Sequence, residues 1–137
     1  MSKSYPSKWM QTGVEELRRK FPYLSEDVPA IASRLAELLY ERLPQGTRIE
    51  LGEADGVLEL FSQEEGPDAS VGYTTFLERG RQAIACAKWE GTREELEVLA
   101  RQATDCFLRA AGGAMDETTR SHIKLALPHD IQDRMFA

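Results

Sequence analysis

The side chains that most often carry chemistry in proteins are few and scattered in this chain. Histidine occurs twice, as His122 and His129, seven positions apart, which would place both on one face of an unbroken helix. Pro128 lies between them and predicts a helix break, so we do not expect the two imidazoles to face a shared ion. A zinc site usually needs about three or four protein ligands. We therefore expect no metal site, with His122 at the surface and His129 in the first turn of the last helix.

The two cysteines form no redox or metal motif. Cys86 and Cys106 are far apart, and neither belongs to a CxxC pair. Both fall in helical patterns, so we expect reduced thiols and no internal disulfide. Cys106 occupies an apolar position of its helix, which predicts a buried and unreactive thiol. Cys86 falls beside an apolar stripe, and its exposure is left open.

Paired carboxylates are frequent, but helix electrostatics explains them. Glu15-Glu16, Glu26-Asp27 and Glu94-Glu95 stand near expected helix starts, where acidic groups complement the helix dipole, and Glu64-Glu65 lies in a linker. A general acid–base pair needs surroundings that separate two pKa values, and nothing here predicts such burial. GxSxG, GxGxxG and GxxxxGK[ST] motifs are absent. We expect no catalytic or cofactor-binding residue and no cofactor, which disfavours an enzyme.

Helical periodicity dominates the elements that would position these residues. Apolar residues from Val28 to Leu43 follow one helix face, with Ser25 or Asp27 as the cap. A second strong helix begins at the capping box of Thr92 and Glu95 and is expected to end at Gly112-Gly113. Asp116 is the expected cap of the next helix, and Pro128 the start of the last. The expected helices span 6–20, 28–43, 47–52, 54–62, 72–88, 93–111, 116–126 and 129–136. Brief alternation at 49–51 and 57–60 leaves a short strand open there.

The two halves of the chain are related in pattern. Adding 68 to six apolar positions between Val28 and Leu39 gives apolar positions between Leu96 and Phe107. Trp9, Met10, Gly13 and Leu17 share their spacing with Phe76, Leu77, Gly80 and Ile84 at an offset of 67, and Val57 and Phe61 with Ile131 and Met135 at an offset of 74. Three blocks in the same order indicate an internal duplication, with a longer connection around 111–115 in the second half.

We therefore predict an all-α fold, a single domain over 1–137. Repeat 1 covers about 6–62, an acidic linker covers 63–70, and repeat 2 covers about 71–137, each repeat with four helices. The helices cross obliquely as in globin-like bundles or stack nearly parallel, and sequence does not decide between these.

Composition excludes several classes of partner. The chain of 137 residues carries a net charge of -6, and neither half is basic, so we expect no nucleic acid and no membrane as partner. The basic cluster Arg18-Arg19-Lys20 is explained by a helix C-terminus. No apolar stretch reaches the roughly 18 residues of a membrane span, and the first residues lack a secretory signal pattern. We expect a cytoplasmic protein.

Three segments resemble a known family. These are residues 38–46 (LLYERLPQG), 73–79 (YTTFLER), and 125–131 (LALPHDI) followed by Met135-Phe136. They are similar to the end of a long helix, the opening of the second repeat and the closing segment of the bacterial proteins catalogued as domain of unknown function 2267. The resemblance covers about 5–137 and implies a helical, duplicated, bacterial protein. It implies no activity, so no catalytic residue carries over.

Excess apolar residues give the leading functional hypothesis, a non-catalytic scaffold that binds a protein partner or forms a homodimer. A short helix over 57–61 cannot bury four apolar residues of five on one face, and the apolar pair Met135-Phe136 near the C-terminus raises the same question. The expected interface residues are Leu58, Leu60, Met135 and Phe136. One alternative is that the short helices wedge into a small core. The other is a binder of a small apolar ligand, such as haem or a lipid, between the repeats.

Overall fold

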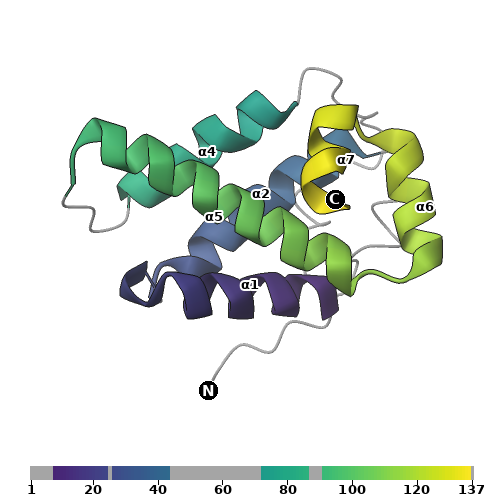
Figure 1. Ribbon diagram of the computed structural model, residues 1–137, viewed down its shortest axis with the longest axis horizontal. Coiled ribbons are helices and arrows are strands. Elements are labelled where there is room, and N and C mark those ends of the chain that lie inside the picture. The colour runs from purple at the N-terminus through teal and green to yellow at the C-terminus, as the bar shows by residue number, and fades with distance from the viewer. Residues whose placement is uncertain (1–7, 25, 44–71, 87–90, 137) are drawn as a thin grey trace.

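The amphipathic segments form α-helices arranged around one long central helix (Figure 1). The computed structural model describes residues 8–24, 26–43, 72–86 and 91–136. No strand occurs within these ranges, and the all-α class is confirmed. The expected helices at 47–52 and 54–62, the linker at 63–70 and the alternating stretches at 49–51 and 57–60 lie outside them. The elements are α1 (Lys8–Lys20), the 3-10 helix η1 (Pro22–Leu24), α2 (Val28–Arg42), α4 (Tyr73–Cys86), α5 (Arg93–Ala114), α6 (Glu117–Ala126) and α7 (His129–Met135).

Helix starts follow the capping residues expected from the sequence. The Thr92 hydroxyl accepts the Glu95 backbone N–H at 3.1 Å, and the Asp116 carboxylate accepts the Thr119 N–H at 2.8 Å. The capping box is modified, because the Glu95 carboxylate accepts from the Thr92 hydroxyl rather than from its backbone. Pro128 is the N-cap of α7. The expected starts of α5, α6 and α7 are confirmed.

The expected end of α5 is wrong. The helix continues through Gly112 and Gly113 to Ala114, so the longer connection expected around 111–115 is helix instead. Arg120 of α6 donates from Nε to the Gly112 carbonyl and from its terminal nitrogen to the Gly113 carbonyl, each at 3.1 Å. These bonds satisfy carbonyls that a helix end otherwise leaves without partners. A tertiary contact thus offsets the low helix propensity of the two glycines.

The core lies where the other helices meet α5. In Figure 1, α1 lies along one side of α5 and α4 crosses the other, and α7 also packs against α5. α2 packs against α1 and α4. The apolar positions of the two strongest predicted helices lie in this core, with Leu35, Leu39, Leu99 and Phe107 between 0% and 4% exposed. Trp9 is buried as well, with its ring edge-on to Phe107 at a centroid distance of 6.4 Å.

Two glycines allow α1 and α4 to approach α5 closely. A Cβ at Gly13 would lie 2.7 Å from a ring carbon of Phe107, and one at Gly80 would lie 2.8 Å from the Thr104 hydroxyl oxygen. Both distances are too short for real carbon contacts, so only glycine fits against α5 at these points. The seam between α1 and α5 formed in this way borders the site described next.

Candidate functional site

The interface expected from the sequence is only partly accessible. Met135 is 2% exposed and packs in the core, which agrees with the alternative that the short helices wedge into it and corrects the expected surface position. Phe136 is partly buried, and the Lys124 ammonium lies 5.3 Å from its ring centroid. Leu58 and Leu60 lie outside the described residues. At its C-terminal end, the chain therefore offers less apolar surface than its sequence predicts.

The two histidines lie where the sequence places them. His122 is exposed on α6, and His129 is exposed in the first turn of α7. Within the described ranges, no group of three or more His, Cys, Asp or Glu side chains is placed to hold a metal ion.

Cys106 is buried on α5, as expected from its apolar position. Burial raises the pKa of its thiol, and the nearby Lys20 ammonium offsets this only in part. A protonated, covered thiol is a poor nucleophile. The side chain of Cys86 lies outside the described part of the chain.

We predict slow modification of Cys106 in the folded protein. In a Cys86→Ser variant, which leaves Cys106 as the single thiol, a disulfide reagent should label native protein at least about tenfold more slowly than urea-unfolded protein. Equal rates in the two states would show that the thiol is freely accessible. Non-reducing gels should show no internal disulfide in the wild type.

A cluster of polar and aromatic side chains joins three helices, and no sequence pattern predicts it. The Tyr73 hydroxyl at the start of α4 donates to Asp105 of α5, and the Arg134 guanidinium of α7 lies 4.6 Å from the Tyr73 ring centroid. Arg134 also approaches the Asp105 carboxylate at 3.7 Å, and the Tyr73 backbone N–H donates to Asp130 at 3.1 Å. Desolvation, followed by the hydrogen bond to Asp105, raises the pKa of Tyr73 to about 12. A tyrosine that holds its proton this firmly is suited to structure and not to proton transfer.

The cluster predicts a pH dependence at the alkaline end. Because the folded-state pKa of Tyr73 is raised to about 12, its contribution to the free energy of unfolding is complete below about pH 10 and is lost as pH rises through 12. The ultraviolet difference titration between wild type and Tyr73→Phe should therefore give a tyrosinate midpoint well above 10. Asp105→Asn removes the anionic acceptor and should lower that midpoint. A midpoint at the ordinary tyrosine value in the wild type would contradict the cluster.

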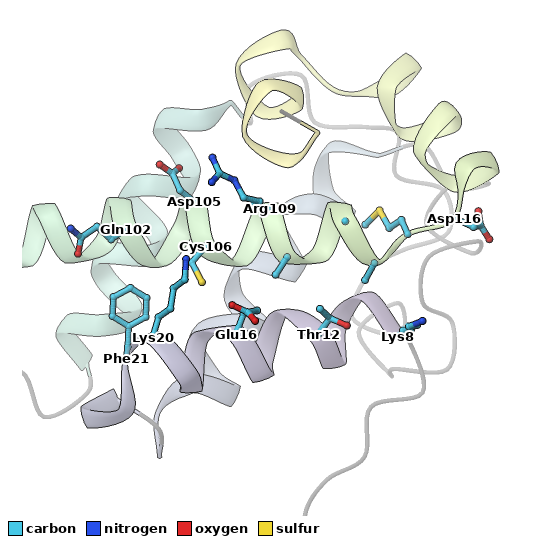
Figure 2. A pocket seen from close by; sticks show the side chains of 14 residues that line it. Lys8, Thr12, Glu16, Lys20, Phe21, Gln102, Asp105, Cys106, Arg109 and Asp116 are labelled. Carbon is cyan, nitrogen blue, oxygen red and sulfur yellow. The ribbon is translucent and has the colours of Figure 1, made fainter.

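A groove runs along the seam of α1 and α5 (Figure 2). It is open to solvent and has a volume of about 1420 Å³. Lys8 and Asp116 lie at one end, and Lys20, Phe21 and Gln102 lie at the other, so the two helices run in opposite directions along it. The α1 wall carries a residue at every fourth position, Lys8, Thr12, Glu16 and Lys20, and the other side and floor are Phe21, Gln102, Asp105, Cys106, Arg109, Ala110, Gly113, Ala114, Met115 and Asp116.

Comparison with known proteins does not identify the chain. No family model, no curated protein and no solved structure matches it. The resemblance to the family of unknown function 2267 stays a prediction.

Among the described helices, none is both long and apolar enough to cross a membrane.

The sequence gives little indication of the groove. Lys8, Thr12, Glu16 and Lys20 occur at a spacing of four, which reads as an ordinary solvated edge of an amphipathic helix. Only the placement of α5 beside that edge turns it into one wall of a cleft.

Proposed function

We propose that this protein is a non-catalytic binding module whose α1–α5 groove receives a helical segment of a protein partner. The observation that supports this most directly is the size and openness of the groove. Its volume of about 1420 Å³ exceeds the roughly 300–1,000 Å³ of typical small-molecule pockets. From Lys8 to Lys20 the α1 wall covers 13 residues, or about 18 Å at the helical rise, which matches about three turns of a bound helix.

The lining disfavours the small apolar ligand considered from the sequence. The groove does run between α1 and α5, which belong to different halves of the chain. However, a charged side chain occurs at each level, from Lys8 and Asp116 at one end to Lys20 at the other. An apolar ligand would leave these charges facing hydrocarbon, which is costly.

The titratable groups near the groove support a binding role over a catalytic one. Asp105 is engaged by Tyr73, whose pKa is raised to about 12, and burial raises the pKa of the Cys106 thiol. A general base or nucleophile instead needs a pKa that is shifted toward the pH at which the protein works.

We also propose, from the sequence pattern, that the chain consists of two related repeats and belongs with the family it resembles. The helix pairing supports this. α1 packs on α5, and α4 packs on α2 as well as on α5, so the first long helix of each half contacts the second long helix of the other half. Globin-like crossing of these helices stays a prediction.

The binding role can be tested by filling the groove. A Cβ built at Gly113 meets no atom within 4 Å, so a Gly113→Trp variant projects a large ring into the groove without a clash at its first carbon. Val98→Trp, on the same helix at a position 56% exposed and outside the groove, is the matched control. In quantitative affinity capture from the native host, at least one protein should bind wild type and Val98→Trp equally and bind Gly113→Trp about tenfold less.

Helical circular dichroism of each variant establishes that the fold is kept. Thr12→Trp on the opposite wall provides a second block of the same groove, so the test does not depend on one substitution. If every captured protein binds both groove variants as it binds the wild type, the groove is not the binding site.

A further inference from the structure

The acidic side chains of the groove already have partners within the chain. Glu16 accepts the Arg19 guanidinium at 2.9 Å, and this hydrogen bond lowers the pKa of the Glu16 carboxyl. Asp105 is bound by the Tyr73 hydroxyl and approached by Arg134, and Asp116 is the N-cap that accepts from Thr119. Each of these three carboxylates thus already accepts a hydrogen bond from within the chain.

The basic side chains of the groove are in the opposite situation. Lys8, Lys20 and Arg109 are all exposed, and none of them forms a hydrogen bond or ion pair within the described residues. Figure 2 shows Lys8 at one end of the cleft and Lys20 reaching from α1 toward Cys106 at the other, while the Arg109 side chain leaves α5 on the side away from α1. The whole chain has a net charge of -6, yet these three cations have no ion-pair partner of their own in the described part of the chain, and Lys20 acts only at longer range, where its charge helps to lower the pKa of Glu16.

The floor between these cations is formed by small or apolar side chains. Ala110, Gly113 and Ala114 follow at spacings of three and four, so they share one face of α5. Gly113 is exposed and open, while the buried Cys106 and Met115 lie toward either end of this strip. Small residues of this kind let a second helix pack closely, near the short end of the roughly 8–10 Å that separates the axes of packed helices.

We infer that the occupant of the groove is an acidic amphipathic helix of a protein partner. This inference rests on the proposed function and adds the chemistry of the partner. The helix places an apolar stripe over Ala110, Gly113 and Ala114, and its flanking Glu or Asp side chains face Lys8, Lys20 and Arg109. Because the three cations are exposed, they act mainly on partner choice and on the rate of association.

A displayed library of helical peptides tests the charge of the occupant. Each peptide is about fourteen residues long and carries a fixed apolar stripe at heptad-like spacing. The positions that flank the stripe vary among Glu, Gln and Lys. Selection on wild-type protein is followed by counter-selection on Gly113→Trp, so that only peptides that need the groove survive. Surviving peptides should carry Glu at the flanking positions at least about three times as often as Lys.

Charge reversal and salt then check the mechanism on one selected peptide. Lys8→Glu/Lys20→Glu should weaken its binding about tenfold, while Arg18→Glu, an exposed cation on α1 outside the groove, should leave it within about twofold. Raising NaCl from about 0.05 to about 1 M shortens electrostatic screening from more than about 10 Å to about 3 Å and should remove most of the difference between wild type and the double variant.

The outcomes separate the two proposals. Groove-dependent peptides with Lys enrichment, or with no charge preference, would overturn the acidic partner and leave the groove as a receptor. No enrichment over Gly113→Trp would overturn the receptor itself and this inference with it. A dimer in sedimentation that Gly113→Trp dissociates would assign the groove to a second copy of the chain and overturn the acidic partner helix.

Discussion

Replacing Gly112 by alanine is expected to destabilise the protein by about 3 kcal/mol, whereas the same change at the neighbouring Gly113 is expected to stabilise it by about 0.5–1 kcal/mol. A Cβ at Gly112 would lie 2.4 Å from the Met135 carbonyl oxygen and 3.0 Å from the carbonyl carbon. These are backbone atoms of α7, so the clash cannot be relieved by a side-chain rotation. At Gly113 the added methyl meets nothing within 4 Å, and alanine has the higher helix propensity.

Urea unfolding monitored by circular dichroism measures both effects, with the midpoint moving down for Gly112→Ala and up for Gly113→Ala. The two residues are adjacent in the same helix, so helix propensity alone predicts that both substitutions stabilise. A stabilised Gly112→Ala protein would show that α7 does not pack on α5 as the structure places it. If only the α7 contact is lost, the burial of Ile131 and Met135 is lost with it, and the unfolding slope should fall.

This glycine pair illustrates what the sequence could and could not predict. Apolar periodicity and capping residues predicted where helices begin, because both signals depend on only a few neighbouring residues. Thr92 and Asp116, for example, are the N-caps of α5 and α6, as expected. Gly112-Gly113 predicted a helix end, since glycine is the usual residue there. Arg120 on the next helix stabilises the end of α5 by donating to the Gly112 carbonyl, and the backbone of Met135 lies close to Gly112. Neither tertiary contact can be inferred from the residues around the glycine pair.

The site was harder to predict than the fold for the same reason. Tyr73 and Asp105 are 32 residues apart, and their bond exists only because α4 and α5 pack together. The groove needs α1 and α5, whose lining residues have ordinary surface types. The interface expected from apolar excess included Met135, but counting apolar residues does not show how deeply α7 enters the core.

The largest loss of stability from a single side-chain truncation is expected at Phe107. It is 0% exposed, its ring rests on Gly13, and Trp9 packs edge-on against it. Phe107→Ala should cost about 3–5 kcal/mol, and Leu39→Ala, at the matching position of α2, about 2–5 kcal/mol, because each loses burial and leaves a cavity. Val98→Ala, on α5 but 56% exposed, should change the free energy of unfolding by less than about 0.5 kcal/mol. Changes below about 0.5 kcal/mol at both core sites would mean that the buried helix faces are wrong.

A double-mutant cycle distinguishes the Phe107–Gly13 contact from general loss of core volume. Gly13→Ala alone should destabilise, since its Cβ would lie 2.7 Å from the Phe107 ring. In the Phe107→Ala background the ring is gone, so the same methyl enters the vacated space and replaces a helix-interior glycine by a better helix former. Gly13→Ala should then be neutral or stabilising, giving a coupling energy of at least about 1 kcal/mol between the two positions. Additive free energies would show that α1 and α5 do not meet at this point, and the seam that borders the groove would have to be redrawn.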